Sequence, residues 1–141
     1  MDGVFDLFHF GHTRAIKQCY DIGYKNRKYD EDVRVIIGVI SDEDTQSYKR
    51  EPVFTLEQRT EIINSLKYVD YVISPAPLVV TKEFIKENGI DIVVHGFADD
   101  EDYDKQKHMH KELIDMGIFE RTKYTTEIST TEIMNKIKTN Y

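Results

Sequence analysis

Apolar and polar residues follow one another along the chain in a pattern that predicts short strands alternating with helices. Short, nearly continuous apolar runs are typical of strands buried on both faces, and they lie at 4–8, 33–40, 68–73 and 90–95. The segments between and after them have helical spacing or helix-capping residues, at 9–22, 43–48, 55–67, 81–88, 105–116 and 130–138. This alternation predicts an α/β fold with a doubly wound, Rossmann-like parallel sheet and helices on both faces.

Capping and breaking residues mark where several of these helices begin and end. Thr55 and Gln58 have the spacing of a capping box, and so do Ser129 and Glu132. Glycines follow three of the helical segments and predict their C-terminal ends, at positions 23, 89 and 117. The acidic stretch 99–104 is expected to be a loop. In a fold of this kind a ligand binds outside the carboxyl ends of the strands.

The length, net charge and cysteine content limit the classes of protein to which the chain can belong. The chain has 141 residues, so we expect 1–141 to form one domain whose first strand is shortened at the N-terminus. The formal net charge of −7 argues against a nucleic-acid partner. The single cysteine, Cys19, excludes a disulfide scaffold and favours a cytoplasmic location. No signal-peptide pattern and no membrane-spanning apolar run occurs.

The stretch G-V-F-D-L-F-H-F-G-H, residues 3–12, carries the strongest chemical signal. It places His9 and His12 where a buried strand turns into the first turn of a helix. Such a turn has free backbone N–H groups and the positive end of the helix dipole, so it favours a phosphate group. Gly11 would let a large anion approach the backbone, and the imidazoles add N–H donors.

Two other roles for the histidine pair are open at this stage. The pair can simply cap the helix, which for a bare H-x-x-H string is about as probable as a phosphate site. A zinc site is less favoured, because no cysteine or acidic cluster supplies the remaining ligands at a recognisable spacing. We therefore predict no resident metal site in the protein.

The string G-x-F-D-x-x-H-x-G-H closely resembles the signature of the H-x-G-H nucleotidyltransferases, specifically the phosphoethanolamine and phosphocholine cytidylyltransferases. The resemblance implies that His9, His12 and a following lysine are catalytic. Lys49, in S-Y-K-R, matches the place of that lysine, although Arg50 replaces the glycine commonly found next. Alternatively, Lys49 is a loop lysine whose side chain is solvated and has no part in the chemistry.

Further positions take nucleotide-binding roles from the same resemblance. The backbone of Val4 and Phe5, together with His95 and Gly96, would line the cytidine and acceptor pockets. Arg59, in E-Q-R-T, matches an arginine of the family's E-R motif, but an ion pair with Glu57 or Glu61 is a serious alternative.

The stretch 126–132, T-E-I-S-T-T-E, resembles the family's R-T-E-G-I-S-T-T segment, which holds the β- and γ-phosphates of CTP at the start of the final helix. The resemblance assigns nucleotide-binding roles there, to Thr126, Ile128, Ser129 and Thr130. Two positions depart from the family pattern: Tyr124 stands in place of an arginine and Glu127 in place of a glycine. Arg121 or Lys123 would have to replace that arginine's contact.

The reaction implied is attack by the phosphate of a small phosphoalcohol on the α-phosphorus of CTP, which gives a CDP-alcohol for phospholipid synthesis and pyrophosphate. Magnesium would accompany the CTP. The resemblance also implies a homodimer through the H-F-G-H stretch and residues 67–72 (K-Y-V-D-Y-V). The long amphipathic membrane-binding helix common in the phosphocholine enzymes does not occur in these residues.

The phosphoalcohol is predicted from the residues that would surround its ammonium group. Phosphocholine enzymes of the family have a tryptophan where this chain has Leu78, and the chain contains no tryptophan at all. The H-G ending at His95-Gly96 is more like phosphoethanolamine enzymes, whose primary ammonium would be held by carboxylates. Candidates for that contact are Asp6, Asp99 and Asp100, whereas Tyr103 or Tyr124 would instead rebuild an aromatic cage.

Three other functions stay open. A glycerol-3-phosphate cytidylyltransferase and an adenylyltransferase of the same superfamily would use the same histidines. A non-catalytic, nucleotide-binding domain would fit the altered segment at Tyr124 and Glu127. The joint presence of His9, His12 and Lys49 favours an active enzyme.

Overall fold

Five short strands and seven helices make up the structure, a computed structural model that describes residues 1–141. The strands are β1 (Asp2–Gly3), β2 (Ile36–Ile40), β3 (Tyr71–Ala76), β4 (Val93–His95) and β5 (Phe119–Arg121). The helices are α1 (Phe10–Asn26), α2 (Asp42–Tyr48), α3 (Leu56–Asn64), α4 (Lys82–Glu87), α5 (Asp100–Gln106), α6 (Lys111–Asp115) and α7 (Thr130–Asn140). A 3₁₀ helix, η1 (Lys107–His110), joins α5 to α6.

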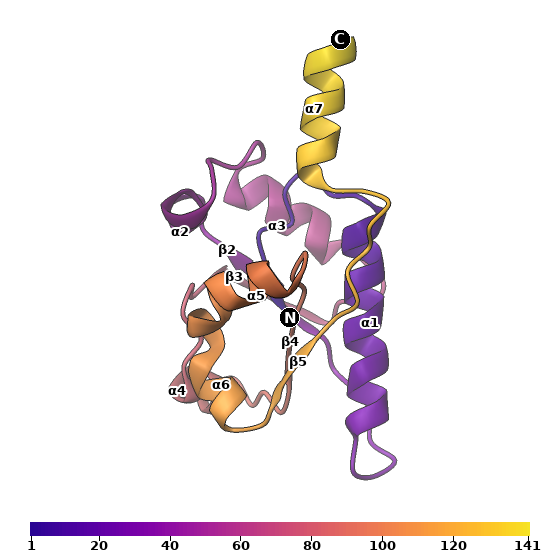
Figure 1. The fold of residues 1–141 in the computed structure, drawn as a ribbon. Helices are drawn as coiled ribbons and strands as arrows, with labels where there is room; N and C mark the ends of the chain where they lie inside the picture. Colours follow the sequence, from indigo (N-terminus) through magenta and orange to yellow (C-terminus); the bar gives the residue numbers. More distant parts are fainter.

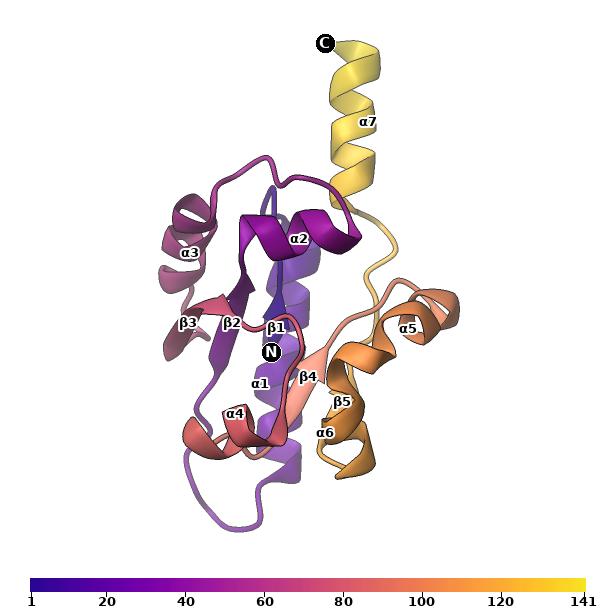
Figure 2. The same ribbon diagram turned by 90° about the vertical axis from the view of Figure 1, so that its left-hand side faces the viewer.

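All strand pairs are parallel. Strands β1, β2 and β3 form one hydrogen-bonded sheet in the order β1-β2-β3, while β4 and β5 form a second. Strand β1 contacts β4, so the order across the molecule is β3-β2-β1-β4-β5 (Figure 2). The order reverses direction between β1 and β4, and in α/β proteins a ligand crevice forms at such a switch point.

Helices cover both faces of this sheet, as predicted. Helices α1 and α3 lie on one face, and α4, α5 and α6 lie on the other (Figures 1 and 2). Each face has its own apolar core because successive side chains of a strand point to opposite sides. The larger core joins α1 to β2 through Ile16, Ile37 and Val39, whereas the smaller one packs Val93 of β4 against Leu113 of α6.

Several predicted boundaries are wrong, for identifiable reasons. Helix α1 does not end at Gly23 but continues to Asn26. Gly23 is required for close packing, because a Cβ there would lie 2.5 Å from a methyl group of Val33. The acidic stretch 99–104 is largely helical, because Asp99 caps α5 with its side chain. Helix 105–116 is divided among α5, η1 and α6.

The strands differ from prediction mainly in length. Strand β3 is shifted toward the C-terminus of the predicted run 68–73 and includes Ser74 and Pro75, which lie beyond that run. Strand β5 was not predicted, since its three residues include two that are charged. Strand β1 is short, as expected, and the Met1 ammonium extends its ladder by donating to the carbonyl of Ile36 at 2.9 Å.

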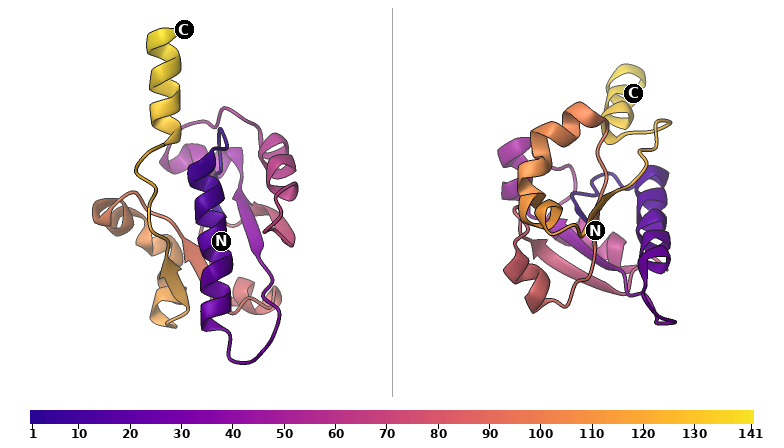
Figure 3. Two further views of the ribbon diagram at one scale, coloured as in Figure 1. Left: turned by 90° about the vertical axis from the view of Figure 1, so that its right-hand side faces the viewer. Right: turned by 60° about the horizontal axis from the view of Figure 1, so that its bottom comes forward.

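Helix α7 projects away from the rest of the molecule, and the C-terminus lies at its far end (Figures 1 and 3). None of its residues is buried. Only its first turn reaches the body, through the hydroxyl of Thr130, which donates to the carbonyl of Asp6 at 3.0 Å. No helix in the structure has both the length and the apolar content needed to cross a bilayer.

Candidate active site

A cavity of about 600 Å³ opens at the carboxyl ends of β1 and β4. It brings together residues from separate parts of the chain: β1 with the loop and first turns of α1 that follow it, α2 with the loop after it, the end of β4, α5, the segment after β5 and the start of α7. Of the residues predicted from the sequence, those that line it are Val4, Phe5, Asp6, His9, Gly11, His12, Lys49, His95, Gly96, Ile128, Ser129 and Thr130. Arg59, Leu78 and Thr126 do not line it.

The two histidines cap helix α1 and face the cavity. The His9 ring accepts a hydrogen bond at Nδ1 from the Gly11 N–H (3.0 Å), and the His12 ring accepts one at Nδ1 from the His9 N–H (3.2 Å). Because both Nδ1 atoms accept, the proton of each neutral ring is on Nε2. Capping therefore fixes the tautomer that leaves an N–H donor on each ring for an anion.

The histidine rings are neutral in the free protein. They stack with centroids 3.9 Å apart. The pKa of His12 is lowered to about 3, mainly by burial; the nearby His9 and Lys49 also lower it, whereas the Asp6 carboxylate raises it. Burial also lowers the pKa of His9. At neutral pH both rings are thus hydrogen-bond donors rather than fixed positive charges.

Gly11 makes room for His9 rather than for a ligand alone. A Cβ at this position would lie 2.8 Å from Cε1 and 2.9 Å from Nδ1 of the His9 ring. It would also lie 3.2 Å from Ile128, next to the start of α7. The glycine between the histidines is therefore needed for the cap itself, a role that the sequence analysis did not include.

Lys49 contributes a positive charge to the cavity, which Arg50 and Lys123 also line. It follows α2 directly, and its ammonium is 5.6 Å from the centre of the Tyr48 ring. Lys49 as a whole residue is exposed to solvent. Burial of its ammonium group by the surrounding protein lowers the pKa of that group, an effect that Asp102 partly offsets. Lys49, His9 and His12 thus face one space, as the sequence predicted.

Asp6 stabilises the loop between β1 and α1 instead of facing a ligand. Only 4% of it is exposed, and its carboxylate accepts hydrogen bonds from the Val53 N–H (2.8 Å), the Phe54 N–H (2.9 Å) and Arg50 (3.1 Å). Burial would raise the pKa of this carboxyl, but these donors outweigh burial and lower it. These three hydrogen bonds give Asp6 a structural role, so its predicted contact with the acceptor stays a prediction, and Arg50 has a role of its own.

The same loop is strained. Phe5 and Leu7 have φ angles of 55° and 46°, in the left-handed region that ordinary residues rarely occupy. Strain of this kind is retained where the surroundings hold it, often at functional sites. Here Asp6, between the two residues, is held on both its side chain and its carbonyl. The loop is thereby fixed in the shape that presents the histidines.

Arg59 is a structural residue, so its predicted nucleotide contact is wrong. Its side chain is fully buried and donates to the carbonyls of Phe54 (3.0 Å), Val4 (2.8 Å) and Ile40 (2.8 Å). It also pairs with Asp42 at 2.6 Å, not with Glu57 or Glu61. These bonds tie the β1–α1 loop to the end of β2.

The start of α7 forms the opposite wall of the cavity. Ser129 caps the helix by accepting from the Glu132 N–H at 3.1 Å. Thr126 is exposed and outside the lining, so its predicted role is not supported. Glu127 pairs with Arg14 at 2.7 Å on the surface. Of the two residues suggested to replace the family's arginine, Lys123 lines the cavity, whereas Arg121 pairs with Asp100.

A cluster of Asp2, His95 and His110 lies beside these groups. His95 Nδ1 is 2.8 Å from Asp2 Oδ1, and His110 Nε2 is 3.0 Å from Asp2 Oδ2. Burial would raise the pKa of Asp2, but the two histidines hold it well below its usual range. Of these three residues, only His95 is among those predicted from the sequence. Asp2, directly before the glycine of the histidine motif, could have been found by its place at the end of the first strand.

The remaining residues suggested for the acceptor lie elsewhere. Asp99 caps α5, Asp100 is bound to Arg121 at 3.0 Å, and Leu78 is partly buried outside the cavity. Tyr124 lines the cavity and Tyr103 does not.

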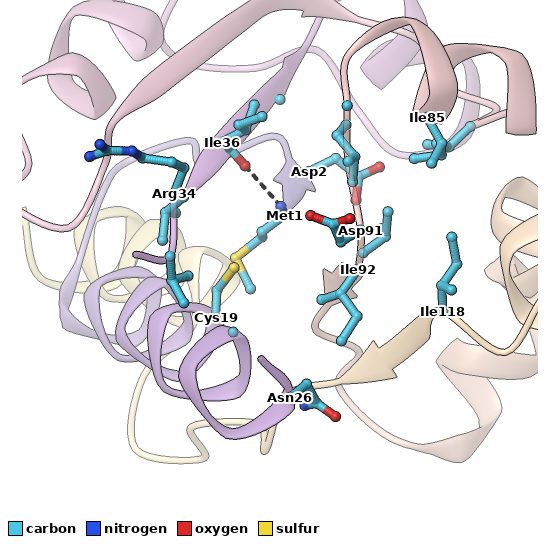
Figure 4. A pocket seen from close by; sticks show the side chains of 18 of the residues that line it. Met1, Asp2, Cys19, Asn26, Arg34, Ile36, Ile85, Asp91, Ile92 and Ile118 are labelled. Atoms are coloured by element: carbon cyan, nitrogen blue, oxygen red, sulfur yellow. Dashed lines mark hydrogen bonds between the residues drawn. The ribbon is translucent and has the colours of Figure 1, made fainter. Parts of the chain in front are cut away.

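A second cavity of about 610 Å³ lies near the amino ends of the strands, between α1, β2 and β4 (Figure 4). About half of its lining residues are apolar, among them Cys19, Ile36 and Ile92, and the lining contains no histidine. The hydrogen bond from Met1 to Ile36 lies at its edge (Figure 4). Ligands of parallel α/β sheets bind at the carboxyl ends, so the first cavity is the candidate active site.

The fold and the site together define an α/β domain whose cavity, at the carboxyl ends of the strands, is lined by a helix-capping histidine pair. The chain belongs to the cytidylyltransferase-like family, whose model matches residues 1–136. A solved structure with the same fold is the lipopolysaccharide core biosynthesis protein from Thermoplasma volcanium GSS1. Its TM-score is 0.64 at 23% identity, over 88% of this chain and 93% of that one.

Curated relatives match over nearly the whole chain. The choline-phosphate cytidylyltransferase of Saccharomyces cerevisiae is 39% identical over 99% of this chain and 31% of its own length. The choline-phosphate cytidylyltransferase A of Mus musculus is 37% identical over 99% of this chain and 36% of its own. A probable ethanolamine-phosphate cytidylyltransferase of Encephalitozoon cuniculi is 36% identical over 96% and 39%. The chain thus spans about a third of the length of these relatives.

Proposed function

We propose that the protein transfers a cytidylyl group from CTP to a phosphoalkanolamine. The observation that carries this proposal is the geometry of the His9–His12 cap, which leaves two Nε2–H donors and Lys49 facing one cavity. The family and the names of the relatives support the same reaction. A phosphate oxygen of the acceptor bonds to the α-phosphorus of CTP, and the bond from that phosphorus to the bridging oxygen breaks to release pyrophosphate.

The residues of the site would act by positioning and by charge stabilisation. Two oxyanionic substrates must approach each other, and the transition state has more charge on the non-bridging oxygens of the α-phosphorus. His9 and His12 donate hydrogen bonds to those oxygens from fixed rings, which is effective because no reorganisation is needed. Lys49 neutralises charge on both reacting phosphates. The positive ends of the α1 and α7 helix dipoles add binding for the triphosphate.

Magnesium is proposed to arrive with the CTP rather than to occupy a site built by the protein. Mg²⁺ prefers oxygen ligands and usually keeps water and substrate phosphates in its shell. Asp6 is already saturated by three donors, and the Asp2 cluster offers two nitrogens, so neither provides an oxygen cage. A phosphate-bound ion fits this cavity, where it would supply additional charge stabilisation.

Phosphoethanolamine is proposed as the preferred acceptor over phosphocholine. The chain has no tryptophan for an aromatic cage around a trimethylammonium group, and Leu78 lies outside the cavity. The cavity wall instead has the Asp2 carboxylate, which can accept hydrogen bonds from a primary ammonium. Loss of a cation–π contact is worth about 0.5–2 kcal/mol, or up to an order of magnitude or so in selectivity. Tyr48 and Tyr124, which line the cavity, are the aromatic residues that oppose this preference.

The test is pyrophosphate release with CTP and magnesium in the presence of phosphoethanolamine, phosphocholine or glycerol 3-phosphate, with ATP replacing CTP as the control. We expect turnover with CTP, and kcat/KM highest for phosphoethanolamine. A ratio favouring phosphocholine would reject the acceptor preference but keep cytidylyl transfer. Turnover with ATP alone would indicate an adenylyltransferase, and no turnover with any pair would reject the enzymatic proposal.

A cytoplasmic homodimer remains our proposal for the assembly and location. Phe10, between the two histidines, is 45% exposed, and Tyr71, within the 67–72 stretch, is 61% exposed, as expected of residues near a subunit contact. Light scattering at micromolar concentration measures this directly. A monomer would remove the dimer without affecting the catalytic proposal.

A further inference from the structure

The Asp2, His95 and His110 cluster has the composition and spacing of a transition-metal site. Its three donor atoms, one from each side chain, all lie within 4.8 Å of one another. The side chains come from β1, β4 and η1, so the fold holds them from three directions. Their exposed fractions are low, at 11% for Asp2, 18% for His95 and 3% for His110.

The donor set selects the class of ion. Two imidazole nitrogens and one carboxylate oxygen suit borderline divalent ions such as Zn²⁺ and Co²⁺, whereas Mg²⁺ prefers an all-oxygen shell. Zinc–ligand bonds are about 2.0–2.2 Å long, so an ion among these atoms would replace the protons that now join Asp2 to the two rings. Asp2 and His95 also line the active-site cavity. The remaining coordination positions of a bound ion would therefore face the cavity.

We propose that Asp2, His95 and His110 bind a divalent transition-metal ion of the zinc class, and that this ion excludes the acceptor from the active site. The inhibitory part of this inference rests on the proposed function, because it requires the acceptor's ammonium group to use Asp2. The metal and the ammonium group are then alternative occupants of one carboxylate. Binding of the metal by itself does not depend on any activity.

The environment of His110 sets the expected strength of binding. Its Nδ1 atom is buried and has no hydrogen-bond partner. When Nε2 binds a metal, the ring proton moves to Nδ1, where it finds no acceptor. Such an acceptor behind a metal-bound histidine typically improves affinity 10–100-fold. We therefore expect a dissociation constant in the micromolar range, as suits a reversible inhibitor, rather than the tight binding of a structural zinc site.

The binding test uses Co²⁺ as a spectroscopic probe with the intact chain and no nucleotide present. We expect visible d–d absorption that saturates at one ion per chain and is reversed by Zn²⁺ but not by Mg²⁺. His110→Gln should remove the signal, and His95→Gln, at a less buried position, should weaken it at least tenfold. His108→Gln changes an exposed histidine of the same 3₁₀ helix and should have no effect.

Three results would overturn the metal site: no saturable signal, an unchanged signal in folded His110→Gln and His95→Gln proteins, or a signal lost in His12→Ala instead. The last result would place the ion on the helix-capping pair. The inhibition test then measures turnover with phosphoethanolamine at increasing Zn²⁺. We expect the KM for phosphoethanolamine to rise about tenfold at a Zn²⁺ concentration ten times the dissociation constant, with kcat unchanged. Zn²⁺ binding without that rise would reject the inhibitory role.

Discussion

Two helix starts face the active-site cavity, and they are held in very different ways. The start of α1 carries the histidines and is fixed by the buried Asp6 and Arg59, which together receive or donate seven hydrogen bonds. The start of α7 is attached by the bond from Thr130 to the Asp6 carbonyl, and the rest of that helix projects from the body (Figure 1). One wall is therefore rigid and the other is lightly anchored.

Because the two walls are held differently, we expect them to affect different kinetic parameters. Groups that stabilise a transition state must be held in place before the reaction, because movement would remove their advantage. Groups that bind the distal phosphates of a flexible triphosphate can adapt to the substrate as it enters. We infer that the α1 wall determines kcat and that the α7 wall mainly determines the KM for CTP. The predictions below test this division, beginning with the largest effect.

Replacing His12 with alanine should nearly abolish turnover while the protein stays folded. Removing one fixed donor to transition-state charge typically lowers kcat by about 10²–10³-fold. The measurement is kcat at saturating substrates, with circular dichroism to check the fold. His108→Ala, an exposed histidine outside the cavity, is the matched control and should keep normal activity. A His12→Ala protein with more than a tenth of the normal kcat would contradict the catalytic assignment.

Replacing Asp6 with asparagine should destabilise the α1 wall itself. The change removes a buried carboxylate that three donors share and leaves some of them without an acceptor. We expect the free energy of unfolding to fall by about 2–3 kcal/mol and kcat to fall with it, as the strained loop relaxes. Urea denaturation measures the first effect. Asp100→Asn removes an exposed ion pair and should change stability by less than about 1 kcal/mol.

Lowering the pH should reduce the free energy of unfolding, because His12 takes up a proton more readily in the unfolded chain than in the folded protein. Its pKa is about 3 in the folded state and 6.5 for an ordinary histidine, so the unfolded chain binds the proton first as the pH falls. Stability is therefore retained above pH 6.5 and lost progressively below it. Between pH 7.5 and 5.5 His12 should account for a loss of about 1 kcal/mol. Denaturation of the wild type and of His12→Asn at both pH values isolates this share; equal losses would contradict it.

Replacing Ser129 with alanine should give the smallest effect and alter binding rather than rate. Loss of a serine cap destabilises a helix start by about 1 kcal/mol, and α7 has no buried residues through which to transmit this to the core. We expect the KM for CTP to rise about fivefold with kcat within twofold of normal. Thr139→Ala, at the far end of α7, is the control. A fall in kcat as large as that of His12→Ala would contradict the inference that the α7 wall affects mainly the KM for CTP.

Sequence patterns predicted the parts of the site that depend on local chemistry. The histidines that cap α1 and the capping residue Ser129 could be recognised because a helix start imposes its own short-range pattern. Asp6 and Arg59 were predicted to bind substrates. A charged residue in a motif gives the same sequence signal whether its side chain contacts a substrate or neighbouring backbone groups. Only the packing of residues 40–54 around them shows that their hydrogen bonds are already used.

The alternation of strands and helices, the α/β class and the family could be predicted from the amino-acid sequence, because periodicity and a contiguous motif are properties of short segments. The tertiary structure alone decided that Gly11 accommodates the His9 ring, that Arg59 is buried, and that Asp2 meets His110 across 108 positions of the chain. The physical reason is that such contacts depend on how β1, β4 and η1 pack together. No spacing between neighbouring residues along the chain records that packing.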